Sequence, residues 1–361
     1  MKHPILRGDL AELPVYRAGE RPSVEGSHSL ASNESHLGAL PGVMEAIEPV
    51  LHRLNRYPDP SGAALAKAIA EFLSIDVESI VLGTGSVGVC QQIVTAACAP
   101  GDEVIHPWRS FEAYPIISRL ASARSVEVPL TNDGGHDLPA MAAAVSERTR
   151  VIFVCTPNNP TGTALTREEL DDFLDRVPHR VLVVIDGAYR EYVEHNPAAR
   201  GLADCLSAAS GRPNVVVLRT FSKAYGLAGL RVGYGIAVPG VAEVLRKTAM
   251  PFGVSSVAQA AALASLAAQD ELRLRVLAVS AERARVVARA RALGWEIPES
   301  HGNFYWLALG DRSEEFARDC LRAGVSVRSF PGEGVRVSVA EPEAGDRVQD
   351  VLERFSPPRA E

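Results

Sequence analysis

A lysine that follows a hydroxyl side chain and precedes a glycine-rich turn is the residue of this sequence best suited to covalent chemistry. Lys223 comes directly after Ser222 and leads into Ala-Tyr-Gly-Leu-Ala-Gly-Leu and Arg231, just beyond the apolar run at 215–218. A lysine amine at the end of a buried strand can form a Schiff base with an aldehyde, while Ser222 and Arg231 can bind a phosphate on it. The segment therefore predicts the chemistry of pyridoxal 5'-phosphate. An isolated lysine would more often be a solvated loop residue, so the prediction depends on its companions.

A second phosphate-binding candidate is the turn at 83–88, Gly-Thr-Gly-Ser-Val-Gly, between a predicted strand and a predicted helix. Backbone N–H groups at a helix N-terminus bind an anion whichever cofactor carries it, and Ser86 and the amide of Val87 are the expected contacts. The same pattern fits a dinucleotide fingerprint, so an NAD-dependent dehydrogenase is the alternative from another class. It is disfavoured because Asp102 and Glu103 precede the next strand, whereas the fingerprint needs an acidic residue at its end.

Asp186 ends the apolar run 181–185, and open α/β sheets bind ligands at the carboxyl ends of their strands. A carboxylate there can keep a pyridine nitrogen protonated, which makes the ring an electron sink. Tyr189 and Asn159 can donate hydrogen bonds to the oxygen of the ring. Asp186 alone could merely cap the next helix. Together with its neighbours it predicts a cofactor-binding role.

Arg336 lies in a predicted strand made otherwise of valine, glycine and serine. An unpaired buried charge is costly, so this guanidinium needs a partner. The α-carboxylate of an amino acid fits its planar fork as a bidentate pair. The sequence therefore predicts that Arg336 binds the carboxylate of the substrate, with an ordinary exposed strand arginine as the alternative.

These motifs together resemble those of the fold-type-I aminotransferases. The segment 220–234, Thr-Phe-Ser-Lys-Ala-Tyr-Gly-Leu-Ala-Gly-Leu-Arg-Val-Gly-Tyr, is similar to the cofactor-lysine segment of the histidinol-phosphate aminotransferase branch. Further similar segments follow in the same order at 31–34, 56–59, 83–86, 157–162, 186–189 and 334–338. Within the branch, the segments 108–114 and 248–256 look more like those of actinobacterial-type aromatic amino acid (phenylalanine) aminotransferases.

The resemblance implies roles for further residues. Phe111 would stack on the pyridine ring, Asn33 would help to hold the substrate carboxylate, and Tyr16 would lie over the substrate side chain. Tyr57 would reach the cofactor phosphate of a neighbouring subunit, so the resemblance implies a homodimer with composite sites. The sequence departs from the frequent Asp-Glu-Ala-Tyr pattern at Gly187, where the family often has glutamate.

The elements that must position these residues follow an alternating order. Helical patterns at 63–72, 87–97 and 167–176 alternate with strand patterns at 79–82, 103–106, 151–155, 181–185 and 215–218. This order predicts an α/β fold with a mostly parallel sheet and helices on both faces. The run 256–293 predicts one or two long helices, and short strands follow at 304–308, 325–328 and 335–339. With the resemblance, we expect an arm at 1–35, a large domain with a seven-stranded sheet at 36–245, and a small α+β domain at 246–361.

Composition limits the function further. A net charge of −7 without a long basic run argues against nucleic-acid or anionic membrane surfaces, which need clustered positive charge. No segment reaches the ~18 apolar residues of a membrane span. The five cysteines include no closely spaced pair, and the histidines form no metal-binding motif. We expect a cytoplasmic protein without a catalytic metal.

The predicted activity is transamination by a ping-pong mechanism, with Lys223 as both cofactor anchor and base. An aromatic amino acid is the expected donor, and a 2-oxo acid such as 2-oxoglutarate is the expected acceptor. Histidinol phosphate is the alternative donor, with Arg328 as the basic group for its phosphate. A phospho-amino-acid decarboxylase of the same fold and a non-catalytic cofactor-binding regulator are more distant alternatives.

Overall fold

A seven-stranded sheet forms the centre of the larger part of the molecule. The computed structural model describes residues 7–10, 13, 26–196, 199, 201–355 and 357. The strands lie in the order β2 (Ile80–Gly83), β8 (Gly233–Ile236), β7 (Val215–Thr220), β6 (Leu182–Asp186), β5 (Thr149–Cys155), β3 (Glu103–Trp108) and β4 (Arg124–Pro129). β8 is antiparallel to both of its neighbours, and the other pairs are parallel. The predicted α/β class with a mostly parallel seven-stranded sheet is confirmed.

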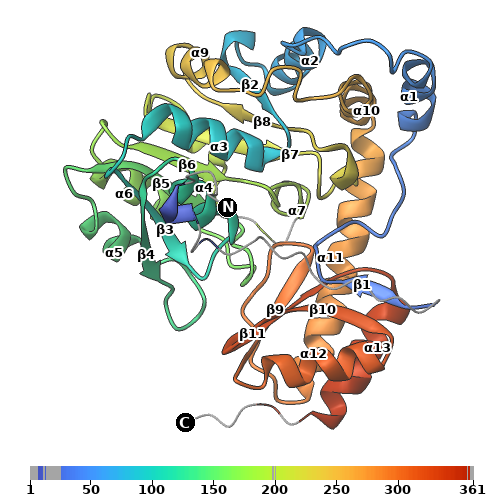
Figure 1. The fold of residues 1–361 in the computed structure, drawn as a ribbon. Coiled ribbons are helices and arrows are strands. Elements are labelled where there is room, and N and C mark those ends of the chain that lie inside the picture. Colours follow the sequence, from blue (N-terminus) through green and yellow to red (C-terminus); the bar gives the residue numbers. More distant parts are fainter. Residues whose placement is uncertain are drawn as a thin grey trace, which may run out of the picture.

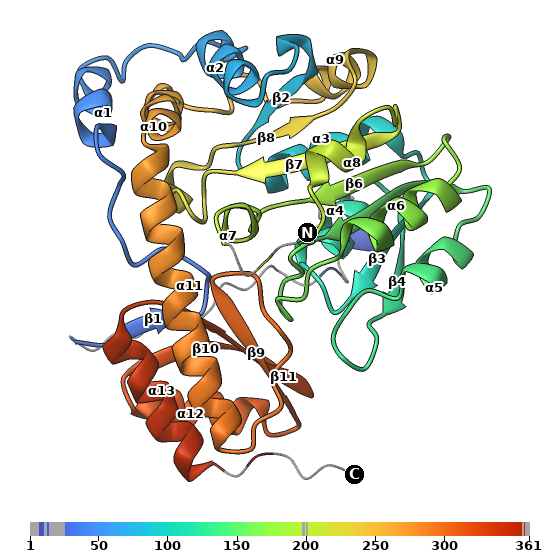
Figure 2. The same ribbon diagram turned by 180° about the vertical axis from the view of Figure 1, so that it is seen from behind.

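Helices cover both faces of this sheet, because its central strands are apolar on both sides. On one face lie α3 (Ser86–Ala97), α4 (Ala113–Leu120) and α9 (Pro239–Lys247), as Figure 1 shows. On the other face lie α5 (Leu138–Ala143), α6 (Arg167–Arg176) and α8 (Cys205–Ala209), which come forward in Figure 2. Successive residues of β6 alternate between the two cores: Val183 and Ile185 pack in one, and Val184 packs in the other.

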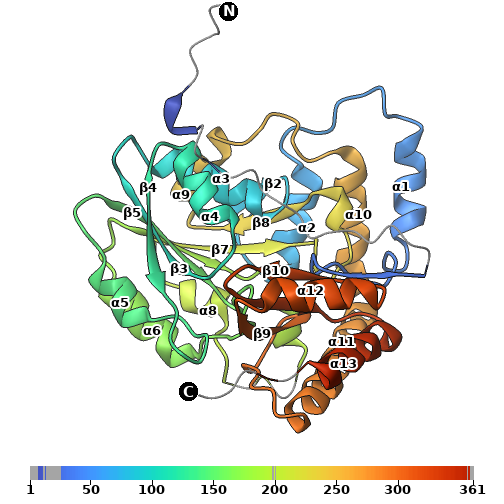
Figure 3. The same ribbon diagram turned by 60° about the horizontal axis from the view of Figure 1, so that its bottom comes forward.

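A smaller sheet lies below the large one, in the order β1 (His28–Leu30), β10 (Val325–Phe330), β11 (Glu333–Ser338) and β9 (Phe304–Gly310). β1 pairs in parallel with β10, so the N-terminal segment joins the C-terminal sheet. The helices α11 (Gln269–Ala292), α12 (Ser313–Arg322) and α13 (Pro342–Arg354) pack beside this sheet, as Figure 3 shows from below. Its strand β11 carries Arg336.

The remaining helices complete the molecule. They are α1 (Val43–Leu51), α2 (Ala63–Leu73), α7 (Glu191–Glu194), α10 (Ser256–Ala267) and the 3-10 turns Gly8–Leu10, Val77–Ser79 and Ala228–Leu230. The helical run expected at 256–293 is two helices, α10 and α11, which meet at Ala268. No helix in the described part of the chain is long and apolar enough to cross a membrane.

Candidate active site

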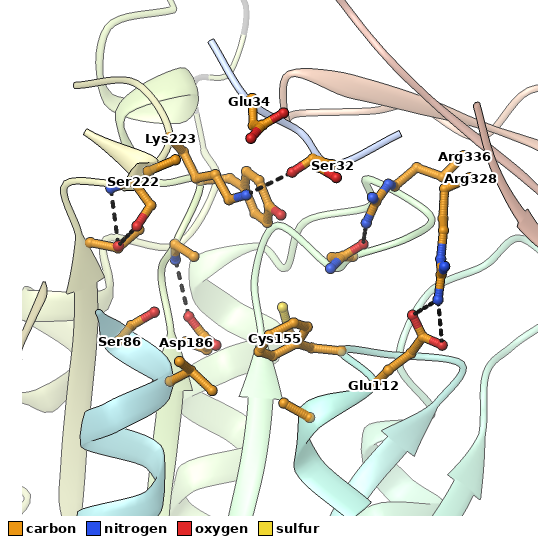
Figure 4. A pocket seen from close by; sticks show the side chains of 18 of the residues that line it. Ser32, Glu34, Ser86, Glu112, Cys155, Asp186, Ser222, Lys223, Arg328 and Arg336 are labelled. Carbon is orange, nitrogen blue, oxygen red and sulfur yellow. Dashed lines mark hydrogen bonds and ion pairs between the residues drawn. The ribbon is translucent and has the colours of Figure 1, made fainter. Parts of the chain in front are cut away.

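A cavity of about 510 Å³ opens between the carboxyl ends of the central strands and the small sheet. Most of the predicted site residues line it: Ser86, Val87, Phe111, Asn159, Asp186, Tyr189, Ser222, Lys223, Arg231, Arg328 and Arg336. Figure 4 shows several of them, with Ser86 and Ser222 at one side of the view and Arg328 and Arg336 at the other. Residues from both sheets therefore meet in one cavity.

Lys223 lies just after β7 and points into this cavity (Figure 4). Its Nζ donates a hydrogen bond to the backbone carbonyl of Ser32, 3.1 Å away. Burial of the amine and the positive charge of Arg336 lower the pKa of Lys223 to about 7, while the carboxylate of Glu34 opposes the shift. A large share of the amine is therefore neutral at neutral pH, which is the form that attacks an aldehyde or accepts a proton.

The groups at one end of the cavity suit a phosphate. Helix α3 begins at Ser86, so its first backbone N–H groups are available to an anion. An Arg231 guanidinium nitrogen donates to the hydroxyl of Ser222 at 3.2 Å. A methyl group on Gly233 would lie 2.5 Å from the amide nitrogen of Ser86, and one on Gly85 would lie 2.5 Å from Arg231. The two glycines keep room for this turn, and the donors fit the phosphate of pyridoxal 5'-phosphate.

Asp186 ends β6 and is buried. Its carboxylate accepts hydrogen bonds from the hydroxyl of Tyr114 at 2.8 Å and from the amide of Ala188 at 3.2 Å. Burial raises the pKa of Asp186, and the two donors and Lys223 oppose the shift. A buried carboxylate with few donors fits a protonated ring nitrogen as its partner. Tyr114 was not predicted as a site residue.

Arg336 reaches the cavity from β11 and is buried. Its guanidinium donates to Oδ1 of Asn159 and to the backbone carbonyl of Ala31, each at 2.5 Å. Asn33 is buried close by but does not line the cavity. The side-chain Nδ2 of Asn33 donates to the hydroxyl of Tyr189 at 3.0 Å, and its Oδ1 accepts from the hydroxyl of Ser338 at 2.9 Å. Asn33 thus positions Tyr189.

An ion pair and several apolar side chains also line the cavity. A guanidinium nitrogen of Arg328 on β10 lies 3.1 and 2.8 Å from the two carboxylate oxygens of Glu112, just before α4. Phe111, Ile116 and Ile117 line the same cavity. Glu112 was not predicted, because nothing in the local sequence indicates its partner.

The remaining predicted site residues are Tyr57 and Tyr16. Tyr57 is 82% exposed and stacks on Phe252, with ring centroids 4.6 Å apart, so it does not contribute to the cavity of its own chain. Tyr16 lies outside the described residues. Among the residues that are described, no group of three or more His, Cys, Asp or Glu side chains is arranged to hold a metal ion.

Comparisons with known proteins agree with this arrangement. Residues 27–353 match the model of the class I and II aminotransferases. Aromatic amino acid aminotransferases from Streptomyces avermitilis and Streptomyces coelicolor are each 53% identical over 354 residues, which is 98% of this chain and of each relative. The crystal structure of histidinol-phosphate aminotransferase from Sinorhizobium meliloti in complex with pyridoxal-5'-phosphate is 28% identical, with a TM-score of 0.86 over 98% of both chains. This chain therefore belongs to the class I and II aminotransferase family.

Proposed function

We propose that this protein is a pyridoxal 5'-phosphate-dependent aminotransferase that moves an amino group between an aromatic amino acid and a 2-oxo acid such as 2-oxoglutarate. The observation that carries the proposal is the meeting of Lys223, Asp186 and the Ser86 turn in one cavity. The names of the two Streptomyces relatives support the aromatic substrate. The apolar side chains of Phe111, Ile116 and Ile117 offer such a substrate a matching surface.

The residues at the cofactor end of the cavity hold the cofactor and move a proton in this proposal. When bound, the cofactor supplies an aldehyde that takes up the amino group and a ring that withdraws electrons from the substrate Cα. Ser86, the amide of Val87, Ser222 and Arg231 hold the phosphate. Asp186 holds the ring nitrogen in its protonated form. Tyr189 and Asn159 hold the ring oxygen, and Phe111 stacks on the ring. The Nζ of Lys223 removes the proton from the substrate Cα.

Arg336 holds the α-carboxylate of the substrate in this proposal, and its fork is oriented by Asn159 and the carbonyl of Ala31. Asn33 acts beside it, through its hydrogen bond to Tyr189. Tyr16 covers the side chain of the substrate. Arg328 lies at the side-chain end of the cavity, where it would meet the phosphate if histidinol phosphate were the donor.

We infer a homodimer, because Tyr57, its stacking partner Phe252 and several other large apolar side chains are exposed. Met44, Leu51, Leu54, Met250 and Phe252 are between 42% and 73% exposed. Such side chains suit an isologous interface, which would bring Tyr57 to the phosphate end of the partner's cavity.

We also propose a cytoplasmic location, which the five unpaired cysteines support. For the domains we propose the limits 1–35, 36–245 and 246–361.

Steady-state kinetics with different donors test the substrate class. With 2-oxoglutarate as acceptor, kcat/KM for phenylalanine, tyrosine or tryptophan should exceed that for histidinol phosphate by about tenfold or more, because each tenfold requires only about 1.4 kcal/mol of differential binding. A higher kcat/KM for histidinol phosphate would assign the protein to the alternative function. Absence of transamination with every donor would overturn the proposed reaction itself.

A further inference from the structure

The charged groups that line the cavity fall into two sets. The basic groups are Lys223, Arg231, Arg328 and Arg336, and the acidic groups are Glu34, Glu112 and Asp186. In the proposed function, Arg231 faces the cofactor phosphate, Arg336 faces the substrate α-carboxylate, and Asp186 faces the ring nitrogen. Glu112 and Arg328 need no ligand for compensation, because each already faces an opposite charge of the protein.

This ion pair lines the cavity on the side away from the proposed phosphate-binding residues. Figure 4 shows Glu112 and Arg328 together, on the side of the view opposite Ser86 and Ser222. The Glu112 side chain is 29% exposed and the Arg328 side chain 16%, so both charges are partly withdrawn from water. Their nearest separation is 2.8 Å, and one guanidinium nitrogen contacts both carboxylate oxygens.

A second ion pair also joins the segment before α4 to the small sheet, but it does not line the cavity. Arg109, three residues before Glu112, contacts Glu333 on β11 through two nitrogens. Neither of these two residues lines the cavity. One of these two ion pairs thus lines the cavity and the other does not. The effect of a charge in the cavity can therefore be separated from the effect of a contact between the segment before α4 and the small sheet.

We propose that Glu112 is a specificity-determining residue that disfavours substrates with an anionic side chain. The inference rests on the proposed function and refines its substrate class. A phosphate or carboxylate that enters this end of the cavity must compete with Glu112 for Arg328 and must lie close to a like charge. An aromatic side chain leaves the pair intact and packs against apolar lining residues such as Ile116 and Ile117. Glu112 therefore raises the cost of binding for every anionic side chain, that of the acceptor 2-oxoglutarate included, and leaves the binding of aromatic side chains unaffected.

Glu112→Gln tests this role because it removes the charge and keeps the shape. The side chain of Glu112 makes no capping hydrogen bond to α4, so the helix keeps its start. We expect kcat/KM for histidinol phosphate to rise by about tenfold relative to that for phenylalanine, and the KM for 2-oxoglutarate to fall. The double variant Glu112→Gln with Arg328→Met should lose this gain, since the cation that attracts the phosphate is gone.

Glu333→Gln is the matched control, because it breaks the neighbouring ion pair outside the cavity. We expect it to leave the ratio of the two kcat/KM values within about twofold of the wild type. Calorimetric binding of glutarate and of 3-phenylpropionate to the cofactor-loaded proteins gives a readout that does not need turnover. Glutarate should bind more tightly to Glu112→Gln, and 3-phenylpropionate should bind about equally to both.

An unchanged substrate ratio and unchanged glutarate affinity in Glu112→Gln would overturn the inference. An equal rise of the substrate ratio in Glu333→Gln would also overturn the inference. The cause would then be the loss of a contact between the segment before α4 and the small sheet, and not a charge in the cavity. The proposed function is judged separately, on the wild-type protein alone. A wild type that uses no aromatic donor would refute that function, whatever the Glu112 variants do.

Discussion

At the scale of single residues, the chemistry centres on the protonation state of Lys223. A lysine with the usual pKa of 10.5 is almost fully protonated at neutral pH, whereas burial and Arg336 lower the pKa of Lys223 to about 7. The neutral amine is the reactive form, and its fraction increases as the pH rises through the pKa. The reactivity of Lys223 should therefore develop near neutral pH.

This gives a prediction for the protein freed of its cofactor. The rate of covalent reaction with added pyridoxal 5'-phosphate should rise with pH up to about 7 and level off above it. The absorbance of the Schiff base would follow the reaction, and Lys223→Ala would serve as the unreactive control. A rate that keeps rising through about pH 9 would mean that the amine keeps a nearly ordinary pKa.

The sequence predicted those site residues that belong to short contiguous motifs at the ends of strands. Lys223, Ser222, Asp186 and Ser86 are of this kind, and all line the cavity. It missed contacts that only folding creates: Tyr114 lies 72 positions from Asp186, and Glu112 lies 216 positions from Arg328. The carbonyl of Ser32, which accepts from Lys223, carries no side-chain signal at all.

At the scale of elements, strong periodicity made helices and buried strands predictable. Helix α6 spans the expected residues 167–176, and its capping box of Thr166 and Glu169 explains where it begins. The strands β4 and β8 were missed for different reasons. β4 is a largely exposed edge strand with two charged residues. β8 contains Gly233 and Gly235, which are unusual in strands but leave room for α3: a methyl group on Gly235 would lie 2.9 Å from Val89.

The close approach of β8 to the start of α3 gives a prediction about Gly233→Ala. The added methyl group would meet three backbone atoms, at 2.5, 2.8 and 2.9 Å. It should lower the free energy of unfolding by about 1–3 kcal/mol and weaken cofactor binding, since Ser86 must shift. Thermal unfolding and cofactor titration would measure both effects.

Gly240→Ala is the control for that variant, because a methyl group there meets nothing within 4 Å. We expect its stability to stay within about 1 kcal/mol of the wild type, with cofactor affinity unchanged. If Gly233→Ala also kept its stability and its cofactor affinity, the close packing of β8 on the Ser86 turn would not be what orders the phosphate end.

At the scale of the whole molecule, the cavity depends on chain segments that lie far apart in the sequence. The large sheet supplies the lysine and the phosphate end, β11 supplies Arg336, and β1 joins the N-terminal segment to the small sheet. Tyr57 is a predicted site residue that lies outside the cavity of its own chain, and it is 82% exposed. A second subunit would explain both facts.

Mixed dimers test this prediction. Lys223→Ala and Tyr57→Ala subunits should each be impaired alone, and after subunit exchange they should regain activity. In a heterodimer with composite sites, one site receives both changes and the other receives neither. Assays before and after confirmed exchange would measure the recovery. If no activity returned although Tyr57→Ala alone was impaired, each site would be built from one chain.

The most direct test of the central claim is a half-reaction without an acceptor. The cofactor-loaded protein is mixed with phenylalanine alone, and phenylpyruvate is measured. Transamination by a ping-pong route should release about one phenylpyruvate per subunit and then stop, until 2-oxoglutarate restores turnover and yields glutamate. If no phenylpyruvate forms before the oxo acid is added, or if histidinol phosphate reacts while phenylalanine does not, the proposed function is wrong.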